Sequence, residues 1–261
     1  MTQLNNMAPI AVIDSGVGGL SVLAELRKIM PEENYLYYGD TANAPYGTKK
    51  REQVLEIMLE NTEKLLSLGA KAIVVACNTA TSAAVRVMRE KYPDLPIVGI
   101  EPAIKPALLV CEHPTVVVMA TPLTLAEEKF NALKERFAND EEIIPLPCPG
   151  LMEIIDAGNT EGEIVDKYIK DVFLPLKGKK IDAVVLGCTH YPFIKKSLQK
   201  HLGSKVAILD GGNGTAREAK RRIEAAGIKN KTKAIGEIKF VFSSDSRADK
   251  ALCERLLKEI N

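Results

Sequence analysis

Runs of apolar, β-branched residues alternate with helix-length segments along the first hundred residues. Strands are predicted at 10–16, 35–40, 71–77 and 96–101, and helices at 19–30, 51–68 and 81–91. The strands are almost continuously apolar, a pattern typical of parallel sheets that helices cover on both faces. The first part of the chain therefore predicts a parallel α/β domain.

The same alternation starts again near residue 115 and predicts a second, similar α/β domain. Strands are expected at 115–121, 143–147, 182–188 and 205–210, and helices at 124–137, at 193–200 and between 147 and 182. A helix at 216–226, a strand at 238–243 and a helix at 247–259 follow, which are too few elements for a third domain. We expect this last segment to pack on one of the two halves.

Two cysteines occupy equivalent positions in the two halves. The segments 72–77 and 183–188 are apolar runs that each end in a cysteine, and polar residues follow both. Open α/β sheets bind ligands beyond the carboxyl ends of their strands. If the two predicted domains face each other across a cleft, Cys77 and Cys188 flank one ligand from opposite sides.

Two facing thiols suit racemisation at a carbon next to a carboxylate. The reaction needs a base on one face of the carbon and an acid on the other, and the roles exchange in the reverse direction. A free thiol has a pKa of roughly 8.5, so a thiol–thiolate pair can serve without a cofactor. Asp14 can assist one thiol and His190 the other. Main-chain and hydroxyl groups at Ser15, Asn78, Thr79 and Thr189 can hold substrate carboxylates.

The glycine-rich segment DSGVGGLSV (14–22) precedes a predicted helix, and helix N-termini bind anions. The segment lacks both the G-x-G-x-x-G register and the Lys-Ser/Thr of a phosphate-binding loop. The sequence therefore favours a carboxylate cradle over a nucleotide site.

Composition argues against several other functions. Lys and Arg number 35 and Asp and Glu 34, and this net charge of +1 does not suit a general nucleic-acid binder. The N-terminus does not read as a signal peptide and no apolar run is long enough to span a membrane, so we expect a cytoplasmic protein. The five cysteines form no C-x-x-C pair, and Cys188 with His190 lacks a third ligand, so no metal is predicted. Cys111, Cys148 and Cys253 are interpreted as packing residues.

Four segments carry a resemblance to the glutamate racemases of the aspartate/glutamate racemase family. They are DSGVGGLSV (14–22), GDTANAPYG (39–47), ACNTAT (76–81) and LGCTHYP (186–192), and they occur in the family's order. The resemblance implies cofactor-independent interconversion of L- and D-glutamate, which supplies D-glutamate for bacterial peptidoglycan. It also implies two α/β domains, 1–97 with 212–261 and 98–211, with the active site between them, in a protein that commonly forms homodimers.

By the same resemblance, Cys77 exchanges the proton of D-glutamate and Cys188 that of L-glutamate. Asp14 and His190 correspond to the groups that assist the thiols. The residues that match the substrate-binding set are Asp14, Ser15, Asp40, Tyr46, Gly47, Asn78, Thr79, Thr189 and His190. His190 also favours glutamate as the substrate, because aspartate racemases typically carry Glu at this place.

Two positions depart from the family pattern. Leu123 stands where the family commonly has Gly, which leaves a substrate contact from Thr121 open. The family's additional active-site acid aligns with Asp156, and Glu153 lies one turn earlier on the same predicted helical face. We leave both acids outside the catalytic set. Two other functions stay open, namely a racemase for aspartate or another acidic substrate and a protein that binds a dicarboxylate or amino acid without turnover.

Overall fold

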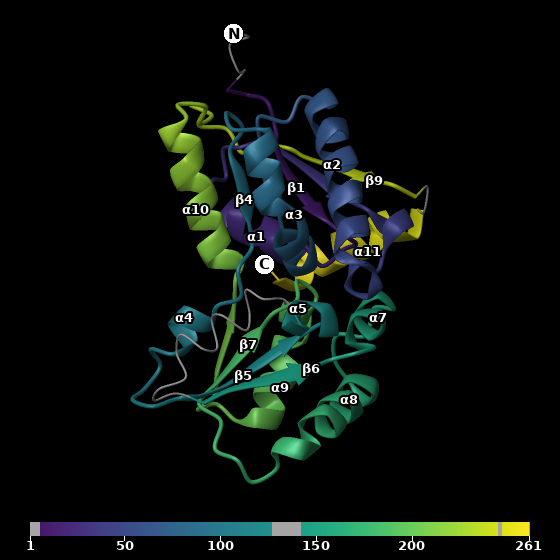
Figure 1. Cartoon of the computed structure of the whole chain (residues 1–261), viewed down its shortest axis with the longest axis vertical. Helices are drawn as coiled ribbons and strands as arrows, with labels where there is room; N and C mark the ends of the chain where they lie inside the picture. Colours follow the sequence, from purple (N-terminus) through teal and green to yellow (C-terminus); the bar gives the residue numbers. More distant parts are fainter. Residues whose placement is uncertain (1–5, 127–141, 245–246, 261) are drawn as a thin grey trace. The chain divides into compact units, whose positions relative to one another are not determined.

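The computed structural model describes residues 6–126, 142–244 and 247–260, which form two parallel-sheet α/β units (Figure 1). One unit is Met1–Glu101 with Gly212–Asn261, and the other is Pro102–Gly211. The prediction of two parallel α/β domains is confirmed. The predicted boundary after residue 97 falls inside a strand, Ile97–Gly99, that pairs into the first sheet, so the first segment extends to Glu101.

The first unit is built on a five-stranded parallel sheet with the order β4-β3-β1-β2-β9. The strands are β1 (Ile10–Asp14), β2 (Tyr35–Gly39), β3 (Ala72–Val75), β4 (Ile97–Gly99) and β9 (Ile238–Phe242). Asp14 lies opposite Gly39, and Ile13 lies opposite Val75. The carboxyl ends of β1, β2 and β3 are therefore neighbours at one edge.

Helices cover both faces of this sheet. They are α1 (Leu20–Ile29), α2 (Arg51–Ser67), α3 (Asn78–Lys91), α10 (Gly212–Ala225) and α11 (Arg247–Ile260), with short 3-10 turns η1 (Thr41–Asn43) and η2 (Tyr46–Thr48). Helices α2 and α3 pack against each other on one face (Figure 1), where Ile13, Met58 and Val75 belong to a common core. Helix α1 packs against α10 and α11.

The second unit holds a four-stranded parallel sheet with the order β6-β5-β7-β8. Its strands are β5 (Thr115–Ala120), β6 (Glu142–Pro147), β7 (Ala183–Leu186) and β8 (Ala207–Asp210). Its helices are α4 (Ile104–Ala107), α5 (Pro122–Ala126), α7 (Leu151–Asp156), α8 (Glu163–Phe173) and α9 (Lys195–Leu202), with η3 (Leu174–Leu176) and η4 (Tyr191–Ile194). The predicted helix 124–137 extends beyond α5 into residues outside the described ranges. Among the helices of the described ranges, none combines the length and the hydrophobicity that a membrane span requires.

The segment after residue 211 returns to the first sheet. Strand β9 pairs in parallel with β2, and the Tyr37 ring lies 6.0 Å from Phe240 and 6.3 Å from Phe242, centroid to centroid. A Cβ atom at Gly39 would lie 2.7 Å from the Phe242 ring, so only glycine permits this close approach. Aromatic packing therefore fixes the register of β9 on β2.

A buried ion pair ties the chain together where β2 and β3 begin. Lys71 and Glu33 are both fully buried and pair with each other. The Lys71 ammonium also donates to the carbonyl of Asn6, and the Asn230 backbone N–H donates to Glu33 Oε1 over 2.8 Å. Both charges are thus hydrogen-bonded beyond the pair, as buried charges require.

Candidate active site

The predicted site residues of the first unit lie at the carboxyl ends of its strands. Asp14 ends β1, Asp40 follows β2, and Cys77 follows β3. All three are buried. Because β3, β1 and β2 are adjacent and parallel, these residues share the edge at which α/β sheets bind ligands.

The Asp14 carboxylate shapes the turn that follows it. Its Oδ1 atom accepts a hydrogen bond from the Gly16 N–H over 2.9 Å, and the Tyr37 hydroxyl donates to the Gly16 carbonyl over 2.7 Å. A Cβ atom at Gly19 would lie 2.7 Å from the Asp14 Cβ, so the glycine allows helix α1 to begin directly against the acid. The acid therefore lies buried beside the N-terminus of α1.

The Cys77 thiol caps helix α3. Its sulfur accepts a hydrogen bond from the Ala80 N–H over 3.5 Å. The thiol donates to the Ser15 hydroxyl oxygen, with 3.9 Å between sulfur and oxygen. The helix begins at Asn78, three residues before the predicted start, because Cys77 satisfies its first turn. A helix N-terminus favours the thiolate form of a cysteine.

Asn78 is a buried polar residue at the same edge of the sheet. Its side chain is buried, and neither its Nδ2 nor its Oδ1 atom has a hydrogen-bond partner among the residues that the structure describes. A buried amide left unpaired costs about 1–3 kcal/mol. Both a donor and an acceptor are therefore available to a polar ligand, one residue from the Cys77 thiol.

The Asp40 carboxylate is the centre of a hydrogen-bond network. Its Oδ2 atom accepts from the Tyr46 hydroxyl over 2.5 Å, from Asn61 Nδ2 over 3.0 Å and from Asn43 Nδ2 over 3.0 Å. Burial, and then the bond to Asp40, raise the pKa of Tyr46 far above its ordinary value, so the hydroxyl stays a donor. The network fixes the 3-10 turn that holds Tyr46 and Gly47. Asn43 and Asn61 were not predicted, since no spacing in the sequence links them to Asp40.

The predicted residues of the second unit form a relay around Cys188. The cysteine follows β7, and its sulfur lies 3.8 Å from His190 Nδ1. His190 Nε2 in turn lies 2.9 Å from Asp156 Oδ1 on α7. A sulfur, an imidazole and a carboxylate in this order form an arrangement in which the carboxylate orients the imidazole beside the thiol. Thr189 lies buried between Cys188 and His190.

Asp156 controls the charge of this imidazole. Burial of the ring disfavours its charged form, but the hydrogen bonds to Asp156 and Cys188 outweigh burial and raise the pKa of His190 well above its ordinary value. Of the two acids left open by the sequence, Asp156 is the one that contacts His190, while Glu153 is exposed on the first turn of α7. The Asp156 side chain is 43% exposed, which leaves the far side of the carboxylate in solvent.

Substitution Asp156→Asn should lower the pKa of His190, because asparagine keeps the shape of the side chain but removes the charge that favours imidazolium. If His190 assists Cys188 as the family resemblance implies, the alkaline limb of the pH–kcat/KM profile should move to lower pH, with a loss of about tenfold at its former plateau. Ring-carbon NMR of His190 and a pH–rate series measure the two effects. Substitution Asp156→Glu keeps the charge and should restore most of both.

The same substitution has a pH-dependent effect on stability. A histidine whose folded pKa is raised contributes its full stabilisation below the unfolded pKa of about 6.5, and loses it as pH rises through the folded value. The difference in free energy of unfolding between wild type and Asp156→Asn should therefore be largest at about pH 5–6.5 and vanish at high pH. An unchanged pKa of His190 in the variant would contradict this account.

The other cysteines differ from one another. Burial, and then the charge of Cys188, raise the pKa of the Cys148 thiol to about 12, so this third thiol stays protonated. Cys148 and Cys253 are buried as predicted, but Cys111 is exposed, so its interpretation as a packing residue is wrong.

The Thr121 hydroxyl shares a hydrogen bond of 2.9 Å with that of Thr124. No group of three His, Cys, Asp or Glu residues in the described ranges is arranged as a metal site.

The structure thus groups the predicted site residues into two sets. Asp14, Ser15, Asp40, Tyr46, Gly47, Cys77, Asn78 and Thr79 lie in the first unit, and Cys188, Thr189 and His190 in the second. Each set contains one cysteine at the carboxyl edge of a parallel sheet.

Comparison with known proteins identifies the family. The family model for Asp/Glu/Hydantoin racemase matches residues 11–219. A glutamate racemase of Clostridium kluyveri is 50% identical over 252 residues, which cover 96% of this chain and 98% of the relative. The Escherichia coli glutamate racemase in complex with L-glutamate and the activator UDP-MurNAc-Ala is 30% identical, with a TM-score of 0.85 over 97% of this chain and 95% of that one.

A third relative is the Francisella tularensis glutamate racemase in complex with D-glutamate. It is 29% identical, with a TM-score of 0.83 over 97% of this chain and 94% of that one. The resemblance to glutamate racemases that four sequence segments carry is thereby confirmed. With a family model that matches most of its length, the chain belongs to the Asp/Glu/hydantoin racemase family.

Proposed function

We propose that this protein interconverts L- and D-glutamate by proton transfer at Cα, with Cys77 and Cys188 as the acid and base and without a cofactor. Relatives that are named glutamate racemase, and that are up to 50% identical in sequence, support the activity. Solved relatives in complex with L-glutamate and with D-glutamate support the substrate. The observation that carries the mechanism is the pair of nearly buried thiols, one per unit, each with a polar partner at a strand's carboxyl end.

The proposed step moves two protons in opposite senses. The Cys77 thiolate takes the Cα proton of D-glutamate, and the electron pair of the broken C–H bond delocalises into the adjacent carboxylate. The Cys188 thiol gives its proton to the other face of Cα, which yields L-glutamate and leaves a thiolate on Cys188. The reverse reaction uses the same groups with exchanged roles.

The neighbours of each thiol have supporting roles in this proposal. His190, held in its charged form by Asp156, stabilises the thiolate left on Cys188 and returns a proton to it, and Asp14 assists Cys77. The Asn78 amide, with Ser15, Thr79 and Thr189, binds the substrate's carboxylates and ammonium. The Asp40 network holds Tyr46 and Gly47 against the substrate rather than reacting with it.

The test is incubation of the purified protein with L-glutamate in D₂O, without pyridoxal phosphate. Circular dichroism follows optical activity, and NMR follows deuterium at Cα. The proposal expects loss of ellipticity together with deuterium in the product. A folded protein that binds glutamate but exchanges no Cα proton would refute it. A parallel run with L-aspartate checks the alternative substrate.

Substitution Asn78→Ala should raise KM for glutamate about tenfold or more, because a charge-assisted contact to a carboxylate contributes about 1.5–3 kcal/mol. Its free energy of unfolding should stay close to that of the wild type, since the amide has no partner among the described residues to lose. Steady-state kinetics and urea unfolding measure the two quantities. Asn61→Ala is the matched comparison, because that buried amide does donate to Asp40 and its loss should destabilise the fold.

We also propose that the protein supplies D-glutamate for peptidoglycan synthesis, acts in the cytoplasm and forms a homodimer. Expression of the chain in a bacterium that requires D-glutamate tests the first point, because growth without added D-glutamate is expected. Sedimentation equilibrium tests the last, with twice the chain mass of 28.5 kDa as the expected result.

A further inference from the structure

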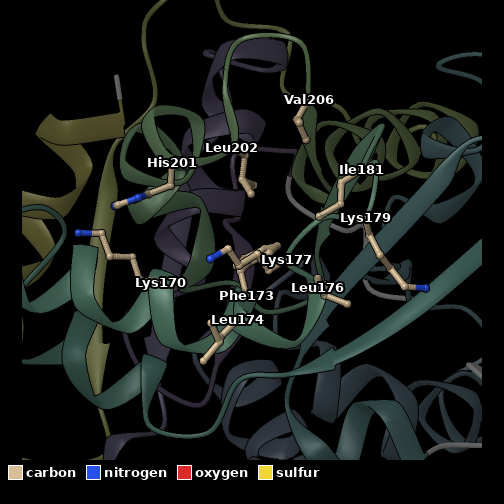
Figure 2. Close-up of a pocket in the computed structure, with 10 residues that line it drawn as sticks. All are labelled: Lys170, Phe173, Leu174, Leu176, Lys177, Lys179, Ile181, His201, Leu202 and Val206. Carbon is tan, nitrogen blue, oxygen red and sulfur yellow. The ribbon is translucent and has the colours of Figure 1, made fainter.

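A cavity of about 440 Å³ opens at the amino ends of β7 and β8 in the second unit (Figure 2). Ile181 and Val206 come just before the two strands, and α8, η3 and α9 contribute the other walls. Its apolar lining consists of Phe173, Leu174, Leu176, Ile181, Leu202 and Val206. Cavities of roughly 300–1,000 Å³ hold small organic ligands.

This cavity is separate from the candidate active site. Cys188 follows the carboxyl end of β7, whereas Ile181 precedes its amino end. The four residues of β7, at about 3.3 Å each, place the two sites on opposite ends of a strand roughly 13 Å long. None of the proposed catalytic or substrate-binding residues lines the cavity.

The polar residues of the lining are all of the basic type. They are Lys170, Lys177, Lys179 and His201, and no acidic residue lines the cavity. Lys179 pairs with Glu142 over 2.7 Å, and His201 Nε2 lies 3.0 Å from Asp166 Oδ1. Lys170 and Lys177 have no carboxylate partner within the described ranges. Figure 2 shows Lys170 and His201 on the same side of the group of lining residues. Two ammonium groups are therefore available to an anion.

We infer that this cavity binds an amphipathic monocarboxylate, with its apolar body against Phe173 and Leu202 and its carboxylate at Lys170 and Lys177. Apolar walls favour a ligand in proportion to the apolar area that it buries. Ammonium groups at the opening favour a carboxylate over a neutral or cationic head group. Glutamate carries charges at both ends and has no apolar body, so it does not suit this cavity.

Decanoate is the probe, and methyl-labelled protein reports where it binds, because half of the residues that line the cavity are leucine, isoleucine or valine. Saturable shifts are expected at the methyls of Leu174, Leu176, Ile181, Leu202 and Val206, with a dissociation constant on the order of 1 mM. Octanoate should bind about tenfold more weakly, since it buries two fewer methylene groups. Decyltrimethylammonium should bind at least about tenfold more weakly than decanoate.

Leu174→Asp tests the site directly, because this side chain is 64% exposed and its replacement leaves the core intact. It should weaken decanoate binding at least about tenfold, since it sets a carboxylate against the ligand's own. Ile164→Asp is the matched control, because Ile164 is 55% exposed on the adjoining α8 but does not line the cavity. A second pair of variants reverses one lysine charge. Lys177→Glu changes a residue that lines the cavity, and Lys196→Glu, at an exposed lysine outside the cavity, is its control.

The inference holds if the shifts are confined to these methyls and each cavity variant binds more weakly than its control. It is overturned if decanoate gives no saturable shift up to about ten times the expected dissociation constant. Equal affinity for decyltrimethylammonium, or equal binding by Leu174→Asp and Ile164→Asp, overturns it as well. Added glutamate should not displace decanoate, and competition between them would also overturn a separate site.

Discussion

Substitution Cys188→Ser should lower kcat in both directions by at least about 10³-fold, because the hydroxyl is a much weaker base than a thiolate and general acid–base catalysis contributes 10²–10⁴-fold. The variant should still exchange the Cα proton of one enantiomer of glutamate but not that of the other. By the proposed roles, Cys77 still exchanges the proton of D-glutamate in D₂O, while the exchange on L-glutamate is lost. Cys77→Ser should give the mirror-image result. NMR of each enantiomer in D₂O measures this directly.

The control for both variants is Cys111→Ser, because Cys111 is exposed and belongs to no part of the proposed site. It should keep the wild-type kcat and exchange with both enantiomers. Loss of exchange on both enantiomers in Cys188→Ser, with the fold intact, would argue against one thiol per face. Retention of full turnover in either serine variant would remove that cysteine from the mechanism.

Substitution Lys71→Met should lower the free energy of unfolding by about 3–5 kcal/mol, because it leaves a buried carboxylate without its counter-charge. Lys71 and Glu33 are both fully buried, so water cannot replace the lost partner. The Asn6 carbonyl loses its donor as well. Urea unfolding followed by far-UV circular dichroism measures the change.

Two comparisons separate the buried pair from a general effect of losing a lysine. Lys28→Met removes an exposed pair with Glu25, whose side chains are 49% and 23% exposed, and should cost less than about 1 kcal/mol. The double variant Lys71→Met/Glu33→Gln should recover part of the loss, because a neutral amide can still accept from the Asn230 N–H. A cost below about 1 kcal/mol for Lys71→Met would contradict the assignment.

The spacing and the types of the apolar residues were enough to predict the strands of both sheets. The apolar runs at 10–16, 35–40, 71–77 and 182–188 all became buried strands, because continuous burial on both faces leaves a signal along the chain itself. The start of α3 was missed, because the usual capping residues are Ser, Thr, Asp and Asn, whereas here a cysteine sulfur accepts from Ala80 N–H.

Long-range polar contacts had no such signal. Asn61 lies within α2, and its bond to Asp40 depends on how that helix packs on the sheet. The Lys71–Glu33 pair joins residues that each precede a strand, and the sequence alone suggests exposed charges there. Asp156 could be predicted in part. The family resemblance narrowed the choice to two acids, and the structure showed that Asp156, rather than Glu153, bonds to His190.

The parallel pairing of β9 with β2 has a consequence for synthesis of the chain. Strand β2 leaves the ribosome early, but its neighbour β9 is translated about 200 residues later, after the whole second unit. During that interval the nascent β2 exposes unpaired N–H and C=O groups along one side, the kind of edge that recruits other chains. The second unit, continuous in sequence, can fold first. Slow translation between residues 211 and 238 would therefore prolong an aggregation-prone intermediate, and chaperone demand should peak there.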